Sequence, residues 1–433
     1  MLKQLLFTLL IIFSVSSVQA GGFQVNAQGQ KQLGMGHVGT GLCFDASTLF
    51  FNPGACRFLP YKFITSGGST LLFPRTQYLE PSPGVYTETM VHHVGTPFNL
   101  YALWNPEKVS SLSLGLAVYT PFGSRAQWPD DWKGQFLIRE IDLKTIFIQP
   151  TASWKIGDYF GVGAGFVYAT GSFDLRKGVP VQNNSAEYGE ATLHGAASGI
   201  GYNSGIYFNA NNFSAGVSYR SSVKVNVENG SADFVVPSSL ADYFPTNTFS
   251  TSIQLPQVTS FGIGYIYNKW KFAVDVNMIG WHSYDTLRID FTTNTDKLED
   301  VHDPRCYKDV SIFRIGAEYK LNENLELRAG AYYDISPVKD GYLTPETPDS
   351  DRLGITCGTS VHFGEKFSAD FALLYIEGMK RTDTNIETGF SGTYKTRLLA
   401  PSIGIQYAIG RILLCGNGRP ENIRKAEPIP INE

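Results

Sequence analysis

The chain contains few residues at spacings that could support catalysis. Gly34, Gly36 and Gly39 form a G-x-G-x-x-G pattern, which holds a dinucleotide phosphate where a strand meets a helix. No predicted strand precedes these glycines and no βαβ pattern follows them, so they indicate backbone freedom in a packed segment. The histidines lie on different predicted strands or loops without a suitably spaced serine, and G-x-S-x-G, H-E-x-x-H and paired C-x-x-C motifs are absent. The sequence therefore predicts neither an enzyme nor a metal or cofactor site.

A second group of residues suits the binding of an apolar ligand with a charged end. Large apolar side chains occur in two predicted loops, and two basic residues could pair with a head group. These residues are Trp128 and Trp132, then Phe234, Val236, Leu240 and Phe244, and the basic Lys308 and Arg314. Leu240 and Phe244 have the i,i+4 spacing of one helix face. In the alternative, the apolar side chains only pack the loops together, and Arg314 pairs with Glu318 on its own strand.

Composition limits the class of protein that positions these residues. The chain has 433 residues, of which 17% are charged and 13% are aromatic, and it contains 44 glycines. A mean hydropathy near zero excludes a polytopic helical membrane protein, and the low charge excludes a disordered chain. A net charge of -4 gives no electrostatic footprint for nucleic acid.

Residues 1–20 are predicted to be a secretory signal peptide. Lys3 precedes an apolar run over 5–15, and Val18-Gln19-Ala20 forms a small-x-small cleavage site. No later span of about 18 uncharged apolar residues occurs. An exported protein with this sequence can cross a membrane only with strands.

Many segments alternate with the period of a β-strand. In 403–409, for example, Ile403, Ile405 and Tyr407 oppose Gly404 and Gln406. Aromatic residues near the strand ends fit the girdles of a membrane barrel. We predict about fourteen strands, at 61–73, 86–104, 110–120, 143–156, 159–172, 200–209, 212–227, 250–267, 270–290, 309–320, 325–335, 352–363, 367–378 and 392–409.

The connections between these strands alternate strictly in length. Every second connection is short and rich in Asn or Gly, as in Gly157-Asp158 and Asn268-Lys269. The long ones are 74–85, 121–142, 173–199, 228–249, 291–308, 336–351 and 379–391. The pattern is typical of an all-β, transmembrane, antiparallel up-and-down β-barrel with periplasmic turns and extracellular loops. A secreted soluble β protein is the alternative.

Residues 21–60 precede the first predicted strand and are too few to form a domain alone. We expect this segment to plug the lumen as a hatch, followed by the barrel over 61–410 and a polar periplasmic tail over 411–433. Cys43 and Cys56 both fall in the segment and could form a disulfide.

An ordered series of short motifs resembles the FadL-type family of outer-membrane transporters for long-chain fatty acids and other hydrophobic compounds. The series includes Gly22-Phe23-Gln24-Val25-Asn26, Phe51-Asn52-Pro53-Gly54-Ala55, Pro121-Phe122-Gly123, Tyr219-Arg220-Ser221, Tyr332-Tyr333-Asp334-Ile335-Ser336-Pro337-Val338 and Asp349-Ser350-Asp351-Arg352. The resemblance implies a fourteen-stranded barrel with an amino-terminal hatch and a lateral exit into the membrane.

Two positions depart from that family. Its hatch signature Asn-Pro-Ala reads Asn52-Pro53-Gly54 here. Fatty-acid transporters of the family set basic residues in the lumen against a carboxylate; Lys308 matches one of them, whereas the position of its arginine partner reads Thr170. The resemblance therefore supports a hydrophobic compound more firmly than a fatty acid.

Together these patterns predict a passive transporter in the outer membrane of a Gram-negative-type bacterium. Its expected partners are a hydrophobic small molecule and the membrane lipid, with no nucleic acid and no cofactor, and we expect a monomer. The ligand would pass from an apolar loop groove to a lumenal site and then past a movable hatch. A general porin for small solutes, a barrel lipase and an adhesive barrel are the alternatives.

Overall fold

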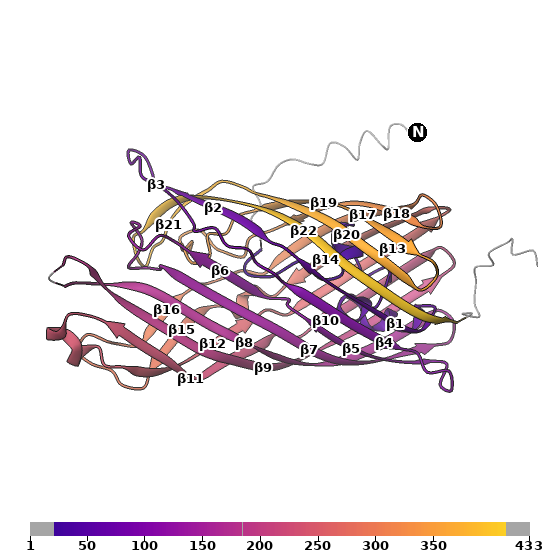
Figure 1. The fold of residues 1–433 in the computed structure, drawn as a ribbon, viewed down its shortest axis with the longest axis horizontal. Helices are drawn as coiled ribbons and strands as arrows, with labels where there is room; N and C mark the ends of the chain where they lie inside the picture. Colours follow the sequence, from indigo (N-terminus) through magenta and orange to yellow (C-terminus); the bar gives the residue numbers. More distant parts are fainter. Residues whose placement is uncertain (1–20, 184, 413–433) are drawn as a thin grey trace, which may run out of the picture.

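A computed structural model of the protein describes residues 21–183 and 185–412. These residues form a closed antiparallel β-barrel of fourteen strands, in which the first strand pairs with the last (Figure 1). The predicted fold class is therefore confirmed. Among the described residues, no helix is both long and apolar enough to cross a membrane. The predicted signal peptide, 1–20, and most of the predicted tail, 411–433, lie outside the described residues.

Several barrel strands are interrupted, so the fourteen strands comprise 22 segments. The first seven strands are β1 (Tyr61–Thr70) with β2 (Phe73–Leu79), β3 (Thr87–Thr89) with β4 (Phe98–Trp104), β5 (Leu112–Tyr119) with β6 (Gly123–Gln127), β7 (Glu140–Ile156), β8 (Phe160–Gln182), β9 (Tyr188–Ala210), and β10 (Phe213–Arg220) with β11 (Val223–Val235). The other seven are β12 (Asn247–Leu255) with β13 (Val258–Tyr267), β14 (Trp270–Ile279) with β15 (Thr286–Phe291), β16 (Val301–Pro304) with β17 (Val310–Lys320), β18 (Leu325–Asp334), β19 (Arg352–Phe363), β20 (Phe367–Gly378) with β21 (Arg381–Thr384), and β22 (Ser391–Arg411). The short helices are α2 (Gln30–Leu33), α3 (Thr48–Phe51), η1 (Pro53–Phe58), η2 (Ser238–Tyr243) and η3 (Trp281–Ser283).

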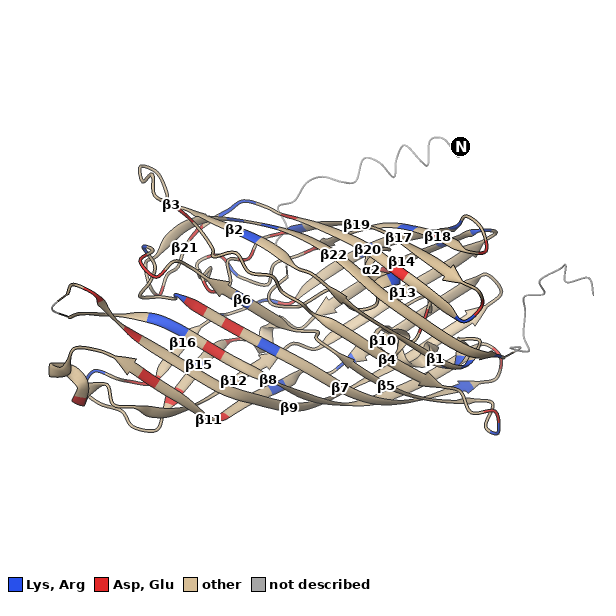
Figure 2. Ribbon diagram, viewed as in Figure 1, with Lys and Arg blue, Asp and Glu red and all other residues tan. Residues whose placement is uncertain are grey.

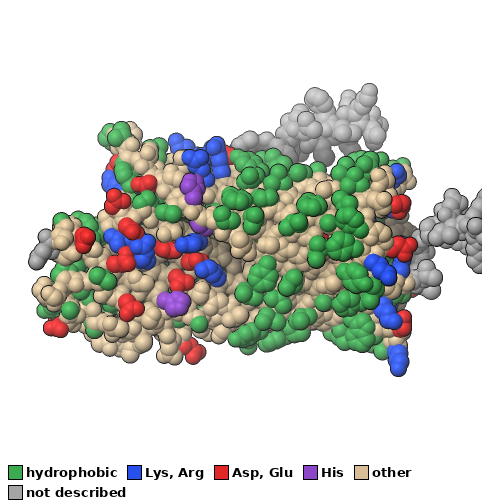
Figure 3. Space-filling model, viewed as in Figure 1, with side chains coloured by type: hydrophobic (Ala, Val, Ile, Leu, Met, Phe, Trp, Pro, Cys, Tyr) green, Lys and Arg blue, Asp and Glu red, His purple; other side chains and the backbone are tan. Residues whose placement is uncertain are grey.

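The outer face of the barrel is apolar over its middle and charged beyond each end of this band (Figure 3). Along β22 the outward apolar side chains run from Ile409 to Leu399, and the intervening Gly404 and Gln406 are buried. Ten residues of a strand tilted by about 40° rise about 25 Å, which matches the apolar band of an outer-membrane barrel. The alternation in the sequence therefore reports a lipid face and a lumenal face.

The tight turns lie at one end of the barrel, and the sequence predicts them correctly. Gly157, Asn211, Asn268 and Gly364 have positive φ angles of 59°, 56°, 54° and 70° there. Such a backbone favours Gly and Asn, which explains their concentration in the short connections. Tyr61 pairs with Arg411 at the start of β1 and the end of β22, so both ends of the barrel lie on this side.

Two of the predicted long loops are largely strand. The expected loop 173–199 is instead a continuation of β8, which runs to Gln182, and of β9, which begins at Tyr188. In the expected loop 228–249, β11 continues to Val235 and β12 begins at Asn247. Phe173 and Leu193 are buried on the inner face of the long β8–β9 hairpin. No lipid faces this hairpin, so most of its outward side chains are polar, and it contains several glycines. The alternation of apolar and polar residues that marks a membrane strand is therefore weak in its sequence.

Residues 21–60, here called the inner segment, fill the interior of the barrel. Gly39 and Thr40 donate backbone hydrogen bonds to Asp275 on β14, each at 2.8 Å, and Lys31 Nζ donates to Gln406 on β22 at 2.8 Å. These contacts reach strands on separate sides of the barrel, so the segment crosses the lumen.

The two cysteines of the inner segment are both free. The disulfide that the sequence allowed between Cys43 and Cys56 is therefore absent from this structure. Burial raises the pKa of both thiols, which keeps them protonated.

Candidate functional site

A small polar cavity of about 30 Å3 lies between the inner segment and the barrel wall. Its titratable lining consists of Arg220 at the end of β10, Asp275 on β14, Arg314 on β17 and the ring of His37 from the inner segment. Strand alternation turns Arg220, Asp275 and Arg314 inward, and each of them is buried. Burying charged groups is costly unless they are paired, so this cluster is a candidate ligand site.

Arg314 is only partly satisfied by the protein. Its Nε donates to Asn277 Oδ1 at 2.5 Å and its Nη2 donates to Asn26 Oδ1 at 2.9 Å. The Nη1 atom is buried without a hydrogen-bond partner, and the guanidinium stands 5.0 Å from the centre of the Tyr332 ring. One donor of Arg314 is therefore available to a ligand.

Arg220 has the same kind of environment. Its Nη2 donates to the Phe50 carbonyl at 3.0 Å, and its guanidinium lies 4.0 Å from the centre of the Phe50 ring. Its Nε is buried without a partner, as is Nε2 of His37. Burial and the nearby Arg314 lower the pKa of His37 well below its usual range, so this ring is neutral. The cavity thus presents unpaired donors from Arg220 and Arg314 together with a titratable ring that carries no charge.

The glycine pattern 34–39 lies beside this cavity and has a packing role. A Cβ on Gly36 would lie 2.4 Å from the Ile315 carbonyl oxygen, and a Cβ on Gly34 would lie 2.9 Å from Gly358 Cα. These glycines let the inner segment approach the wall closely enough for His37 to reach the cavity. They hold no phosphate loop, because no strand precedes them within residues 21–33 and the first α-helix of the segment, α2, ends at Leu33.

Wall pairing is lost beside the inner segment, between the second and third strands. Asn99 pairs with Tyr119, and Val91 N donates to the Gln127 carbonyl. Between these points the described residues of the two strands share no backbone-to-backbone hydrogen bond, and the Thr120 hydroxyl donates to the Phe98 carbonyl at 3.3 Å. We call this stretch, 92–98 and 120–126, the wall gap.

The inner segment occupies the inside of the wall gap. Val25 N donates to the Pro121 carbonyl at 2.9 Å, and Gln28 Nε2 donates to the Thr120 carbonyl at 2.8 Å. Pro121 cannot donate to a ladder, which helps to break the strand there. A movement of residues 23–28 would therefore change the interior surface of the gap.

The start of the inner segment is anchored to the loop before β19. Gly21 N donates to the Ile335 carbonyl at 2.7 Å, and Gly22 N and Ser336 Oγ both donate to Asp349 Oδ2, at 3.0 and 2.7 Å. Burial raises the pKa of Asp349 to about 6, and Arg352 opposes this shift. These contacts join several of the short motifs that the sequence singles out.

The structure separates the apolar loop residues into two groups. Trp128 and Trp132 stack with ring centres 4.5 Å apart, and both are buried against Tyr78. Phe234 near the end of β11 packs against Phe244 in the connection that follows, with ring centres 5.8 Å apart.

The second group follows β11, which lies on the opposite side of the barrel from β2, the strand that carries Tyr78 (Figure 1). Val236 follows β11, and Leu240 lies on the 3-10 helix η2. The expected i,i+4 α-helical face of Leu240 and Phe244 is therefore wrong, because η2 is a 3-10 helix that ends at Tyr243. Leu240 and Phe244 are half-buried rather than free in solvent.

The predicted basic residues also separate. Arg314 lines the cavity, but Lys308 is not among the residues that line it. Lys308 lies nearer the barrel mouth, where its backbone N donates to the Pro337 carbonyl at 2.8 Å. Thr170 lies on the outer face of β8 with Phe166 and Tyr168, so that position does not face the lumen. Arg220 was not among the predicted site residues, although its inward place at the end of an alternating strand is a usable signal.

The Asn52-Pro53-Gly54 motif stands at the start of η1. Asn52 Oδ1 accepts a hydrogen bond from Gly54 N at 3.0 Å, and its Nδ2 donates to the Thr40 carbonyl at 3.0 Å. A Cβ on Gly54 would lie 2.7 Å from the Gly205 carbonyl oxygen, so this position has no room for a side chain. The family signature has Ala at this position, and the glycine found here allows the close contact with β9.

Comparisons with known proteins agree with this architecture. Residues 11–407 match the model of a family described as outer membrane protein transport protein (OMPP1/FadL/TodX). A long-chain fatty acid transport protein of Salmonella typhi is 24% identical over 410 residues, covering 87% of this chain and 93% of the relative. A putative outer membrane protein of Neisseria meningitidis is 24% identical over 457 residues, covering 94% and 98% of the two chains.

Solved structures of similar fold have lower sequence identity. A Pseudomonas aeruginosa FadL homologue has a TM-score of 0.77 at 17% identity and covers 90% of this chain and 100% of its own. The Ralstonia pickettii toluene transporter TbuX has a TM-score of 0.68 at 16% identity, with 88% and 98% covered. At these identities the structural likeness bears on the fold.

Proposed function

The chain belongs to the OMPP1/FadL/TodX family of outer membrane transport proteins, and from this we propose that it carries long-chain fatty acids or similar hydrophobic compounds by passive diffusion. It is an outer-membrane transporter of hydrophobic compounds and not an enzyme, since the family consists of transporters and channels. The observation that carries the finer proposal is the pair of buried arginines, Arg220 and Arg314, each with an unpaired donor beside one cavity. A carboxylate suits such donors, because it forms short charge-assisted hydrogen bonds with a guanidinium group.

The proposed route begins at the barrel mouth. Apolar side chains at the end of β11 and in η2, namely Phe234, Val236, Leu240 and Phe244, make the first contact with the ligand, and Trp128 and Trp132 form the floor of the mouth. Lys308 near the mouth attracts the anionic head group, which then reaches Arg314. The inner segment acts as a hatch, with Asn52-Pro53-Gly54 as its close contact to the wall, and the ligand leaves sideways through the wall gap.

Binding to the purified protein tests the lumenal step. R314Q removes a charge-assisted hydrogen bond worth about 1.5–3 kcal/mol, so we expect oleate to bind about 10 to 100 times more weakly. Binding of the uncharged oleyl alcohol should change little, and the exposed R125Q variant should bind oleate normally. Equal losses for oleate and the alcohol would contradict a carboxylate site.

The same assay, together with uptake by whole cells, separates the mouth from the lumen. L240D/F244D should slow uptake while leaving oleate affinity in detergent unchanged, because these residues act before the lumenal site. Normal uptake by this variant would show that Leu240 and Phe244 do not contact the ligand on its way into the barrel.

Aromatic hydrocarbons are the second candidate substrate class, because solved structures with this fold include those of the toluene transporters TbuX and TodX. A ligand without a carboxylate does not need the unpaired donors of Arg220 and Arg314. Toluene binding that is unaffected by R314Q, without measurable binding of oleate, would favour this class. We further propose that the transporter is a monomer surrounded by outer-membrane lipid, which the mass of the detergent-solubilised protein tests.

A further inference from the structure

Outward charges near the extracellular end of the hydrophobic band follow two different patterns. On β6, β7 and β8, acidic and basic side chains alternate, so that Arg125 pairs with Glu140 at 2.9 Å and Lys144 pairs with Asp142 at 2.8 Å. Figure 2 shows this group as adjoining red and blue segments. These charges neutralise one another and leave no excess of either sign for a ligand.

A second group, on β2, β20 and β22, is not balanced. Arg75 and Arg397 are directly opposite each other in the sheet, and Lys395 follows on the same face of β22. We call Arg75, Lys395 and Arg397 the basic patch. Glu377 on β20 is the acid that contacts it, at 2.7 Å from Lys395 Nζ and 3.0 Å from Arg397 Nε.

The single acid leaves the basic patch with an excess of two positive charges. None of the ion pairs among the described residues includes Arg75. Like charges directly opposite in a sheet repel, so the Arg75–Arg397 pair is unfavourable by itself. An anion between the two guanidinium groups would remove this repulsion, and phosphate suits their forked donors.

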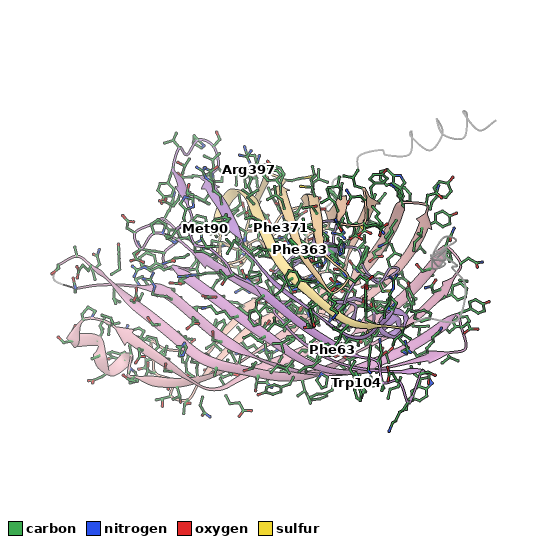
Figure 4. The ribbon with its side chains drawn as sticks, turned by 45° about the vertical axis from the view of Figure 1, so that its right-hand side comes forward. Phe63, Met90, Trp104, Phe363, Phe371 and Arg397 are labelled. Carbon is green, nitrogen blue, oxygen red and sulfur yellow. The ribbon has the colours of Figure 1, made fainter. Side chains whose placement is uncertain are left out.

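The depth of the basic patch limits which anion can reach it. Phe73 pairs with Leu399 one step nearer the middle of the barrel, and Tyr375 pairs with the same Leu399 from the other side. All three are at least 40% exposed, and they face the lipid. Figure 4 shows Arg397 at one end of the wall, with Phe371 farther along β20 toward the other end.

This end lies opposite the tight turns and both ends of the barrel, and is therefore the extracellular end. On both β2 and β22, the outward side chain changes from apolar to basic within two residues toward this end of the barrel. The basic patch is thus at the level of the head groups of the outer leaflet.

We propose that the basic patch binds a phosphate of an acylated, phosphorylated glycolipid of the outer leaflet, with the acyl chains along Phe73, Leu399 and Tyr375. The lipid stays on the outside of the barrel, so this site is separate from the transport route. Its phosphate bridges Arg75 and Arg397, and Lys395 adds a third positive charge. The site would anchor the transporter to the outer leaflet.

The test measures binding of diphosphorylated lipid A to the purified full chain in mild detergent by native mass spectrometry. R75Q/R397Q should weaken binding at least tenfold, because it removes two charge-assisted contacts. R125Q/K144Q, at the balanced group, is the matched control and should bind normally. E377Q should bind about threefold more tightly, since it removes the competing acid. Unchanged binding by R75Q/R397Q, or an equal loss in the control, overturns the proposal.

Two ligand controls separate the lipid from its parts. Dephosphorylated lipid A should not bind measurably; binding as tight as that of the phosphorylated form would reduce the site to acyl contacts and overturn the proposal. Inorganic phosphate at 10-fold excess over the lipid should not displace it, and complete displacement would assign the patch to free phosphate. The mobility of unheated protein on gels shows whether each variant is folded. If R75Q/R397Q does not fold, the tighter lipid binding expected of E377Q still tests the proposal.

Discussion

Gly36 shows how a single residue in the inner segment controls the site. Its φ of +72° is unfavourable for any residue with a side chain, and the added Cβ would lie 2.4 Å from the Ile315 carbonyl oxygen. The next residue, His37, has a φ of 60° and reaches the lumenal cavity. A strained backbone of this kind persists only where the surrounding contacts hold it in place. Gly36 therefore makes possible the close approach that places the His37 ring.

Substituting Gly36 by alanine should separate this close contact from the effect of φ alone. Gly364 has a φ of +70° with open space around it, so G364A should cost only about 1 kcal/mol in the free energy of unfolding. G36A should cost about 2 kcal/mol more, because the Cβ also meets the wall. Unfolding in urea, in lipid vesicles, measures both variants. Equal costs would show that Gly36 is needed only for its backbone angle.

At the scale of elements, the sequence predicts the barrel better than it predicts the site. Period-two alternation and tight Asn/Gly turns locate the membrane strands, because lipid on one side and the lumen on the other impose a strict pattern. The long β8–β9 hairpin is missed, since no lipid faces it. Arg220 and Asp275 can be predicted to point inward, but their meeting with His37 depends on how the inner segment folds back across the lumen. That path is set by tertiary contacts.

The wall gap is an element-scale feature with a direct test. Gln24 forms an isolated antiparallel bridge with Phe122, so the paired residues are close enough for an engineered disulfide. In a background without the native cysteines, oxidised Q24C/F122C should fix the inner segment across the gap. Uptake should then fall at least tenfold and return when a reductant opens the bond.

A matched pair of cysteines away from the wall gap is the control. Thr382 and Thr393 join β21 and β22, with hydroxyl oxygens 2.7 Å apart. Oxidised T382C/T393C should transport normally, because it adds a bond without restraining the inner segment. If the Q24C/F122C bond forms completely and uptake continues, the ligand does not pass the gap or the segment does not have to move.

At the scale of the whole molecule, the filled interior distinguishes this barrel from a general porin. The inner segment crosses the lumen, and the described cavity of about 30 Å3 beside it offers space for about one water molecule. A hydrated sugar or ion needs a continuous aqueous path, whereas a lipophilic ligand can pass between apolar surfaces as they separate. Liposomes that contain the protein should therefore take up oleate without swelling in isotonic solutions of small sugars. A general porin reconstituted in parallel provides the positive control for swelling. Swelling in sugar solutions at the rate of that porin would contradict the hatch and show that the protein is an open pore. A hatch that occupied the lumen for most of the time would prevent such swelling.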